Sequence, residues 1–283
     1  MEDLPINIKK RIARYKEISV YGLTLYPVRV KYYDEFLIGR AALEVMHQSL
    51  KANYLRVPLL SALYAIDFQA AMQGETPTGL FSRSLVCLAL ALRLAEGGTI
   101  EQMVRQFEIA VDPNDSARLL RLRFTGADGQ EHSITPAQFA DLRKIIAAQN
   151  GVRLESDKAN PDIVKAEKDM ASAGGIDLDV NLEDWISAVS SLSGASEDEI
   201  DDWPILKFQR RSQSFQRILD YLICGIGECG GMVSWPKGNP HPHPFFDRVT
   251  DSGVLRSLGG SADDPPSVPP QAGAALRDMT KNL

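Results

Sequence analysis

The sequence of 283 residues contains few cysteines, and their number is odd: Cys87, Cys224 and Cys229. A protein stapled by disulfides usually carries an even set of cysteines at close spacings, and this chain is long enough to bury a core without such help. We therefore expect free thiols and a reducing compartment, without a disulfide framework.

Long hydrophobic runs are also missing. The most apolar segment, residues 80–95, is shorter than the roughly 20 residues that a membrane-spanning helix needs, and it contains Arg83 and Arg93. The first 16 residues are charged and have no apolar segment of the kind found in signal peptides. These absences predict a soluble protein of the cytoplasm, with no contact with a membrane.

Clustered basic residues are scarce as well. The net charge is −6, and no basic block occurs outside the segment that begins at Lys207. Binding of nucleic acid needs grouped Lys and Arg side chains that neutralise phosphates. We therefore expect no nucleic-acid partner.

Recognisable catalytic motifs are also missing from the sequence. The chain has no GxSxG or HExxH motif, no phosphate-binding loop, and its lone histidines His47 and His132 fall in a predicted helix and a predicted hairpin. Its acidic residues form exposed runs and are not isolated in apolar surroundings that would tune a carboxyl group for catalysis. The sequence predicts neither an enzyme nor a cofactor.

What is present is helical periodicity with a smaller β signal. We predict a mainly α fold with small β-hairpins (α+β), built as a helical bundle. Alternation predicts a strand or tight hairpin at residues 18–30 and a hairpin at 119–134. Residues 1–16 are expected to form a short helix or an arm. Apolar spacing and caps predict further helices at residues 31–50, 54–72, 80–95, 99–110, 136–150, 160–173, 181–192 and from 196 onward.

Composition divides the chain into four regions. We predict an N-terminal α+β region (1–151), a charged connector (152–180), a C-terminal helical region (181–236) and a disordered tail rich in Pro, Gly and Ser (237–283). Within them, residues 80–95 are apolar nearly all round and form the best candidate for a central buried helix.

Residues 196–235 carry the longest helical signal. Ser196 and Glu199 form a predicted capping box, and Pro204 suits the first position of a second, longer helix. An apolar stripe follows along that helix: Ile205, Phe208, Phe215, Leu219, Leu222 and Ile226. Basic residues lie largely off the stripe: Lys207, Arg210, Arg211 and Arg217. They form a solvated face, pair with the acidic run from Glu197 to Asp202, or engage an acidic partner.

The end of this stretch combines cysteines with glycines. Cys224, Cys229, His241 and His243 fit no common zinc module, and on a helix the two cysteines lie about 140° apart, so we expect no metal. Glycines close the stretch at four positions: Gly225, Gly227, Gly230 and Gly231. Either they mark a helix end, or Gly227 and Gly231 let another backbone come close.

Two segments resemble a known family. The first, ITPAQFADLRKIIAAQNGV, matches a pattern F-x-x-L/I-R-x-I-I-x-x-Q-N through Phe139, Leu142, Arg143, Ile145, Ile146, Gln149 and Asn150. The second, residues 182–235, matches through an LED helix start, an acidic DEI, Lys207-Phe208 and Gly231-Met232-Val233. Together with residues 23–36, they resemble tail-region proteins of phages and prophages of Gram-positive bacteria, commonly classed as tail assembly chaperones or as unassigned tail proteins.

The resemblance implies a non-enzymatic factor in the cytoplasm of the bacterial host. It would bind the tape-measure protein or a neighbouring tail component during tail assembly; the alternative is a structural tail or baseplate component that stays in the virion. Self-association remains open. A groove for an amphipathic helix needs an apolar lining and a polar rim, and seven residues are the candidates for it: Lys207, Phe208, Arg211, Phe215, Tyr221, Gly227 and Gly231.

Overall fold

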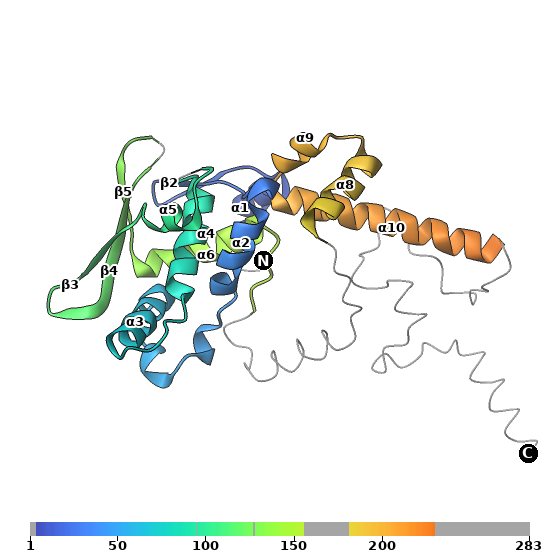
Figure 1. Cartoon of the computed structure of the whole chain (residues 1–283). Helices are drawn as coiled ribbons and strands as arrows, with labels where there is room; N and C mark the ends of the chain where they lie inside the picture. Colours follow the sequence, from blue (N-terminus) through green and yellow to red (C-terminus); the bar gives the residue numbers. More distant parts are fainter. Residues whose placement is uncertain (1–3, 95, 127, 156–180, 230–283) are drawn as a thin grey trace, which may run out of the picture. The chain divides into compact units, whose positions relative to one another are not determined.

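The computed structural model describes residues 4–94, 96–126, 128–155 and 181–229 (Figure 1). Its fold is α+β, mainly helical with two small antiparallel sheets, as the sequence predicts. The chain forms two compact units: Met1–Ala173 with Ser196–Gln209, and Gly174–Ala195 with Arg210–Leu283. The region predicted at 181–236 is therefore shared between both units. The helix predicted at 160–173 and the tail predicted to be disordered at 237–283 lie outside the described residues.

Helices of the first unit surround α4 (Leu80–Leu92), which is buried on almost every side, as predicted. Against it pack α2 (Tyr33–Leu43), α3 (Leu59–Met72) and α5 (Ile100–Val104). The first unit also contains α1 (Ile6–Ala13), α6 (Pro136–Gln149) and α9 (Glu197–Asp201). Short 3₁₀ turns η1 (Val30–Tyr32), η2 (His47–Ser49) and η3 (Ala52–Tyr54) connect them. The single helix predicted at 31–50 is thus wrong in extent, because the chain is divided into η1, α2 and η2.

The first sheet pairs β1 (Ile18–Val20) with β2 (Leu23–Leu25), confirming a tight hairpin. Its two turn residues, Tyr21 and Gly22, both have positive φ angles of 55° and 74°. A two-residue turn with this backbone matches the right-handed twist of paired strands.

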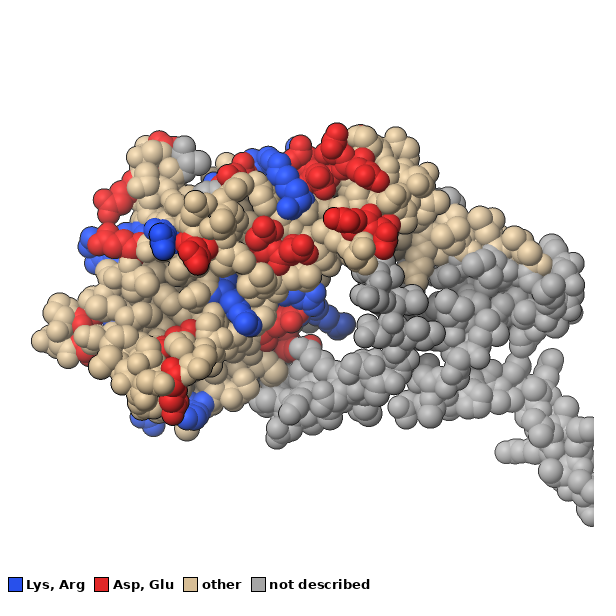
Figure 2. All heavy atoms as spheres, in the orientation of Figure 1, with Lys and Arg blue, Asp and Glu red and all other residues tan. Residues whose placement is uncertain are grey.

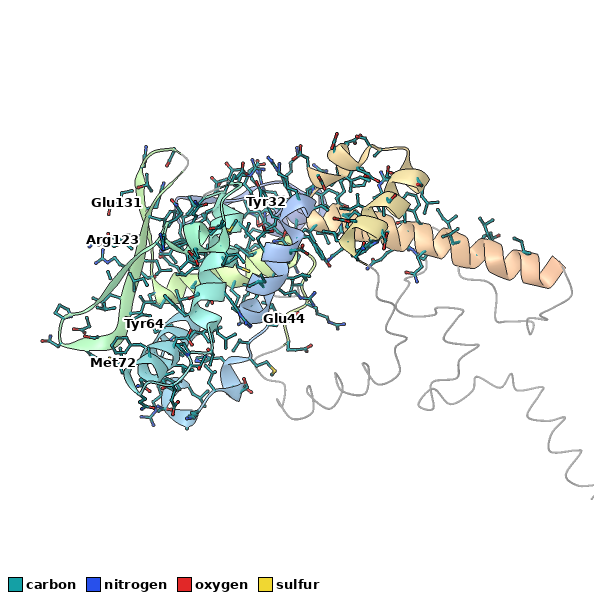
Figure 3. All side chains as sticks on the ribbon, in the orientation of Figure 1. Tyr32, Glu44, Tyr64, Met72, Arg123 and Glu131 are labelled. Carbon is teal, nitrogen blue, oxygen red and sulfur yellow. The ribbon has the colours of Figure 1, made fainter. Side chains whose placement is uncertain are left out.

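The second sheet has the order β3-β4-β5, with β3 (Glu108–Asp112), β4 (Asp115–Thr125) and β5 (Glu131–Ile134). The hairpin of β4 and β5 is confirmed, but the helix predicted to reach residue 110 is wrong. A Thr99–Gln102 capping box starts only the short α5, after which the chain turns back as β3. Tyr64 of α3 donates a hydrogen bond to the Ser116 carbonyl at 3.2 Å, which ties this helix to the sheet (Figure 3).

The pattern residues of α6 have structural roles. A capping box of Thr135 and Gln138 starts this helix, and the apolar pattern residues are buried. Arg143 donates to the carbonyl oxygens of Leu43 (2.7 Å) and Val45 (2.6 Å), which satisfies acceptors at the end of α2. The motif that carries the family resemblance therefore encodes packing in this chain.

Two buried amides end α6. The Asn150 side-chain oxygen accepts from the Val28 N–H at 2.9 Å, while Gln149 donates to the carbonyl oxygens of Leu25 and Lys16, each at 3.3 Å. Asn150 is 0% exposed and Gln149 is 2% exposed. The N-terminal hairpin and the chain after it are thereby fixed to α6.

A short antiparallel bridge joins segments that are far apart in the sequence. The Val30 N–H donates to the Trp203 carbonyl and the Ile205 N–H donates to the Val28 carbonyl, both at 2.9 Å. Asp202 pairs with Arg29 (3.3 Å) and Lys31 (3.0 Å) beside this bridge. Figure 2 shows acidic side chains gathered over α9 next to basic ones. This bridge fixes the start of α10 (Ile205–Cys229).

The second unit contains α8 (Leu182–Ser193) and the greater part of α10. The Asn181 side chain accepts from the Asp184 N–H at 2.7 Å, so the predicted cap is confirmed. Gly194 ends α8 in the left-handed conformation, with φ 72°.

Candidate helix-docking face on α10

The first turn of α10 belongs to the core of the first unit. The Phe208 N–H donates to the Pro204 carbonyl at 3.0 Å, so the proline starts the helix as expected. Ile205 and Phe208 are both 0% exposed. Phe208 is therefore an interior residue, and its predicted place in a partner groove is wrong.

Beyond residue 210 the same stripe is exposed. Phe215, Leu219, Leu222 and Ile226 follow one another at steps of four, three and four residues, which keeps them within about 60° on the helix surface. Phe215 is half-buried, whereas the exposed fractions of Leu219, Leu222 and Ile226 are 44%, 51% and 72%. We call these four residues and Arg211 the α10 face.

Arg211 is exposed and lies one turn before Phe215, about 40° from it around the helix. Arg211 is therefore the exception among the basic residues, which were expected to lie largely off the stripe. Arg210 and Arg217 lie on the opposite side, where Ser214 donates to the Arg210 carbonyl at 2.8 Å and accepts from Arg217 at 3.2 Å. The α10 face is thus mainly apolar, whereas the opposite side of the helix carries polar and basic side chains.

Lys207 has a local role. Its ammonium lies 3.7 Å from the centre of the Trp203 ring, a cation–π contact in the first unit. The Trp203 indole N–H donates to Glu199 at 3.4 Å, and the Ser196 hydroxyl accepts from the Glu199 N–H at 3.2 Å. Ser196 caps α9 as predicted, while the Glu199 carboxylate turns to Trp203 and does not complete a capping box.

Of the other predicted groove residues, Tyr221 is 41% exposed but lies about 130° from the centre of the α10 face. Gly227 is within the helix, which continues to Cys229, and it too lies about 110° away from that centre. Gly231 lies outside the described residues. Sequence reasoning identified the stripe but did not name Leu219, Leu222 and Ile226 among the candidate partner residues, because the period that identifies a stripe does not tell whether anything covers it.

The described residues contain no group of three or more His, Cys, Asp or Glu side chains placed to hold a metal ion. The backbone is helical from Cys224 to Cys229, so the break needed to bring these two cysteines together is not found there. His241 and His243 lie outside the described part of the chain. Burial raises the pKa of the Cys87 thiol well above its usual value, which makes this cysteine a packing residue.

A shallow pocket on the first unit is a second candidate site. Apolar residues including Leu90 and Met103 line it, and Arg29, Arg93 and Glu96 lie at its edge. The Arg93 guanidinium lies 4.1 Å from the centre of the Tyr26 ring and 3.6 Å from Glu96. Arg29 pairs instead with Asp202 at 3.3 Å, so the charged groups at the edge of the pocket are engaged within the first unit.

The α10 face is therefore an exposed apolar row with a basic residue, Arg211, at its N-terminal end. Where it is visible, the distal part of α10 presents uncharged side chains (Figure 2). Within the ranges that the structure describes, no helix is both long enough and apolar enough to cross a membrane. No protein-family model, curated protein or solved structure matches the chain.

Proposed function

We propose that the chain is a non-enzymatic assembly factor that holds an amphipathic helix of another protein against the α10 face. Together with the resemblance to phage tail proteins, this makes the tape-measure protein, or a neighbouring tail component, the partner in the cytoplasm of the host. The observation that carries the proposal is the exposed row of Leu219, Leu222 and Ile226. A row at these steps is the pattern by which helices dock side by side.

The size of the row indicates reversible binding. Complete burial of a fully exposed Leu or Ile side chain contributes about 1.5–3 kcal/mol, so three side chains about half exposed contribute roughly 3–4 kcal/mol. Association itself costs at least about 4 kcal/mol in lost translational and rotational freedom. The row by itself does not offset that cost, so it supports at most a weak, reversible contact, whereas a permanent virion component needs a larger interface.

The binding test uses Leu222→Ser on the α10 face and Tyr221→Ser as its matched control. The two side chains are adjacent and similarly exposed, at 51% and 41%, but only Leu222 lies on the face. We expect the tape-measure protein to co-purify with the wild type and the control from infected cells, and to be lost with Leu222→Ser. Circular dichroism checks that both variants are folded. Equal recovery with all three proteins would remove the α10 face from consideration.

Mass spectrometry of purified phage particles separates the two roles in the tail. An assembly factor leaves before the particle is complete, so the chain is expected to be absent from particles while it co-purifies with the tape-measure protein from infected cells. Stoichiometric presence in the particle would overturn the chaperone role in favour of a structural tail or baseplate component.

A further inference from the structure

We infer that Arg211 selects the orientation of the bound helix by pairing with a carboxylate that lies one turn beyond one end of the partner's apolar row. This inference rests on the proposed function and adds a specificity-determining residue and the charge of the partner. It identifies the partner as an amphipathic helix with an acidic residue at a defined spacing.

The first step is the charge on the α10 face. Among the residues between 211 and 226 whose side chains the structure describes, Arg211 is the one charged residue on the side of the row; by its helical position Asp220 falls about 130° from the centre of the row. Arg217 lies even farther around the helix, beside Ser214. A helix docked on the row therefore meets a single cation, at the N-terminal end of the face.

The second step is the spacing. Arg211 precedes Phe215 by four residues, or about 6 Å along the axis, and precedes Ile226 by about 22 Å. A partner with an apolar row of three turns covers Phe215 to Ile226, and its carboxylate then reaches Arg211 from one turn outside that row. In an antiparallel complex this carboxylate follows the C-terminal end of the partner's row; in a parallel complex it precedes the row.

The third step concerns the occupant. Two copies of this chain paired in parallel through this face would place Arg211 against Arg211, and like charges in register oppose association. Within the α10 face itself, no acidic residue is available to receive Arg211 of a second copy. Charge complementarity therefore favours a different, acidic helix over a second copy of the chain.

The test measures binding of three synthetic helical peptides to the full-length chain by fluorescence anisotropy. All have the same three-turn row of Leu and Ile; two carry Glu one turn before or one turn after it, and the third carries Lys at both places. Because Arg211 is next to the half-buried Phe215, we expect roughly tenfold tighter binding of one Glu peptide than of the Lys peptide, above the upper range for exposed ion pairs.

Arg211→Glu should reverse this preference, whereas Gln213→Glu, about 150° away on the helix, should keep it. Equal affinity of the wild type for all three peptides, with binding still lost in Leu222→Ser, would overturn the role of Arg211 and leave the proposed function intact. Absence of any peptide binding that depends on Leu222 would overturn both. Dimerisation of the wild type through this face in sedimentation experiments would replace the acidic helix by a second copy.

Discussion

The amide of Asn150 offers a direct test of how the first unit is held together. Asn150→Ala removes the side-chain oxygen that accepts from the Val28 N–H at 2.9 Å. Val28 is 2% exposed, so water does not replace the lost partner in the structure. The Ile146 carbonyl loses the Asn150 side-chain donor but still accepts from the Asn150 backbone N–H at 3.2 Å. The main effect of the substitution is therefore to leave one buried group, the Val28 N–H, without a hydrogen-bond acceptor.

Leaving such a group unpaired costs about 1–3 kcal/mol, and the void left by the amide adds to this. We expect the free energy of unfolding to fall by about 3 kcal/mol, which corresponds to roughly 6–12 °C in Tm for a unit of this size. Urea unfolding of the full-length chain followed by circular dichroism measures the change, with an unchanged m value as evidence that only stability is altered.

The neighbouring amide is the matched control. Gln149 is buried to a similar degree, but its side-chain oxygen has no hydrogen-bond partner in the structure and its donor bonds are long, at 3.3 Å. Gln149→Met keeps the volume and removes the unpaired oxygen, so we expect a loss below about 1 kcal/mol. Equal losses for Gln149→Met and Asn150→Ala would refute the reasoning, because burial alone would then set the cost.

Two further predictions concern packing and charge in the first unit. A Cβ atom at Gly39 would lie 2.6 Å from the Cys87 sulfur, so Gly39→Ala should lower stability by about 1–3 kcal/mol. Thermal unfolding should show partial recovery in the double variant with Cys87→Ala, and no recovery would contradict the clash. The hydrogen bond from Lys31 holds the pKa of Asp202 below its ordinary value of 3.8. The ionised Asp202 carboxylate therefore stabilises the folded state fully above pH 3.8, and this contribution is lost as the pH falls through the pKa of the folded state. Asp202→Asn should therefore be less stable than wild type at pH 6 and equal to it at the lowest pH at which both fold; a constant difference across pH would contradict this linkage.

The local elements could be predicted from the sequence because their signals are local. The capping box at Thr135 and the all-round apolar pattern of α4 each occupy a few adjacent residues. The strand β3 has no such signal, since a short, partly polar strand is stable only when it pairs with β4. The bridge between residues 28–30 and 203–205 is still less visible, because its two partners are separated by most of the chain.

For the candidate site, the sequence likewise could not predict which residues of the apolar stripe are buried and which are exposed. Phe208 and Leu222 belong to one stripe with one period, and the sequence treats them alike. In the structure Phe208 is 0% exposed and Leu222 is 51% exposed. Periodicity determines which residues share a face of a helix, but whether another element covers that face depends on the packing of the whole unit.

The bridge also has a consequence for the order in which the chain becomes structured during synthesis. The Val28 carbonyl and the Val30 N–H are made early, but their partners belong to residues Ile205 and Trp203. Ile205 and Leu206 join the same hydrophobic core as the N-terminal hairpin. The first unit therefore stays incomplete on the ribosome until residue 209 has left the exit tunnel, and a fragment that stops before residue 196 exposes both the bridge and part of the core. The N-terminal region predicted at 1–151 is consequently a poor choice for expression by itself.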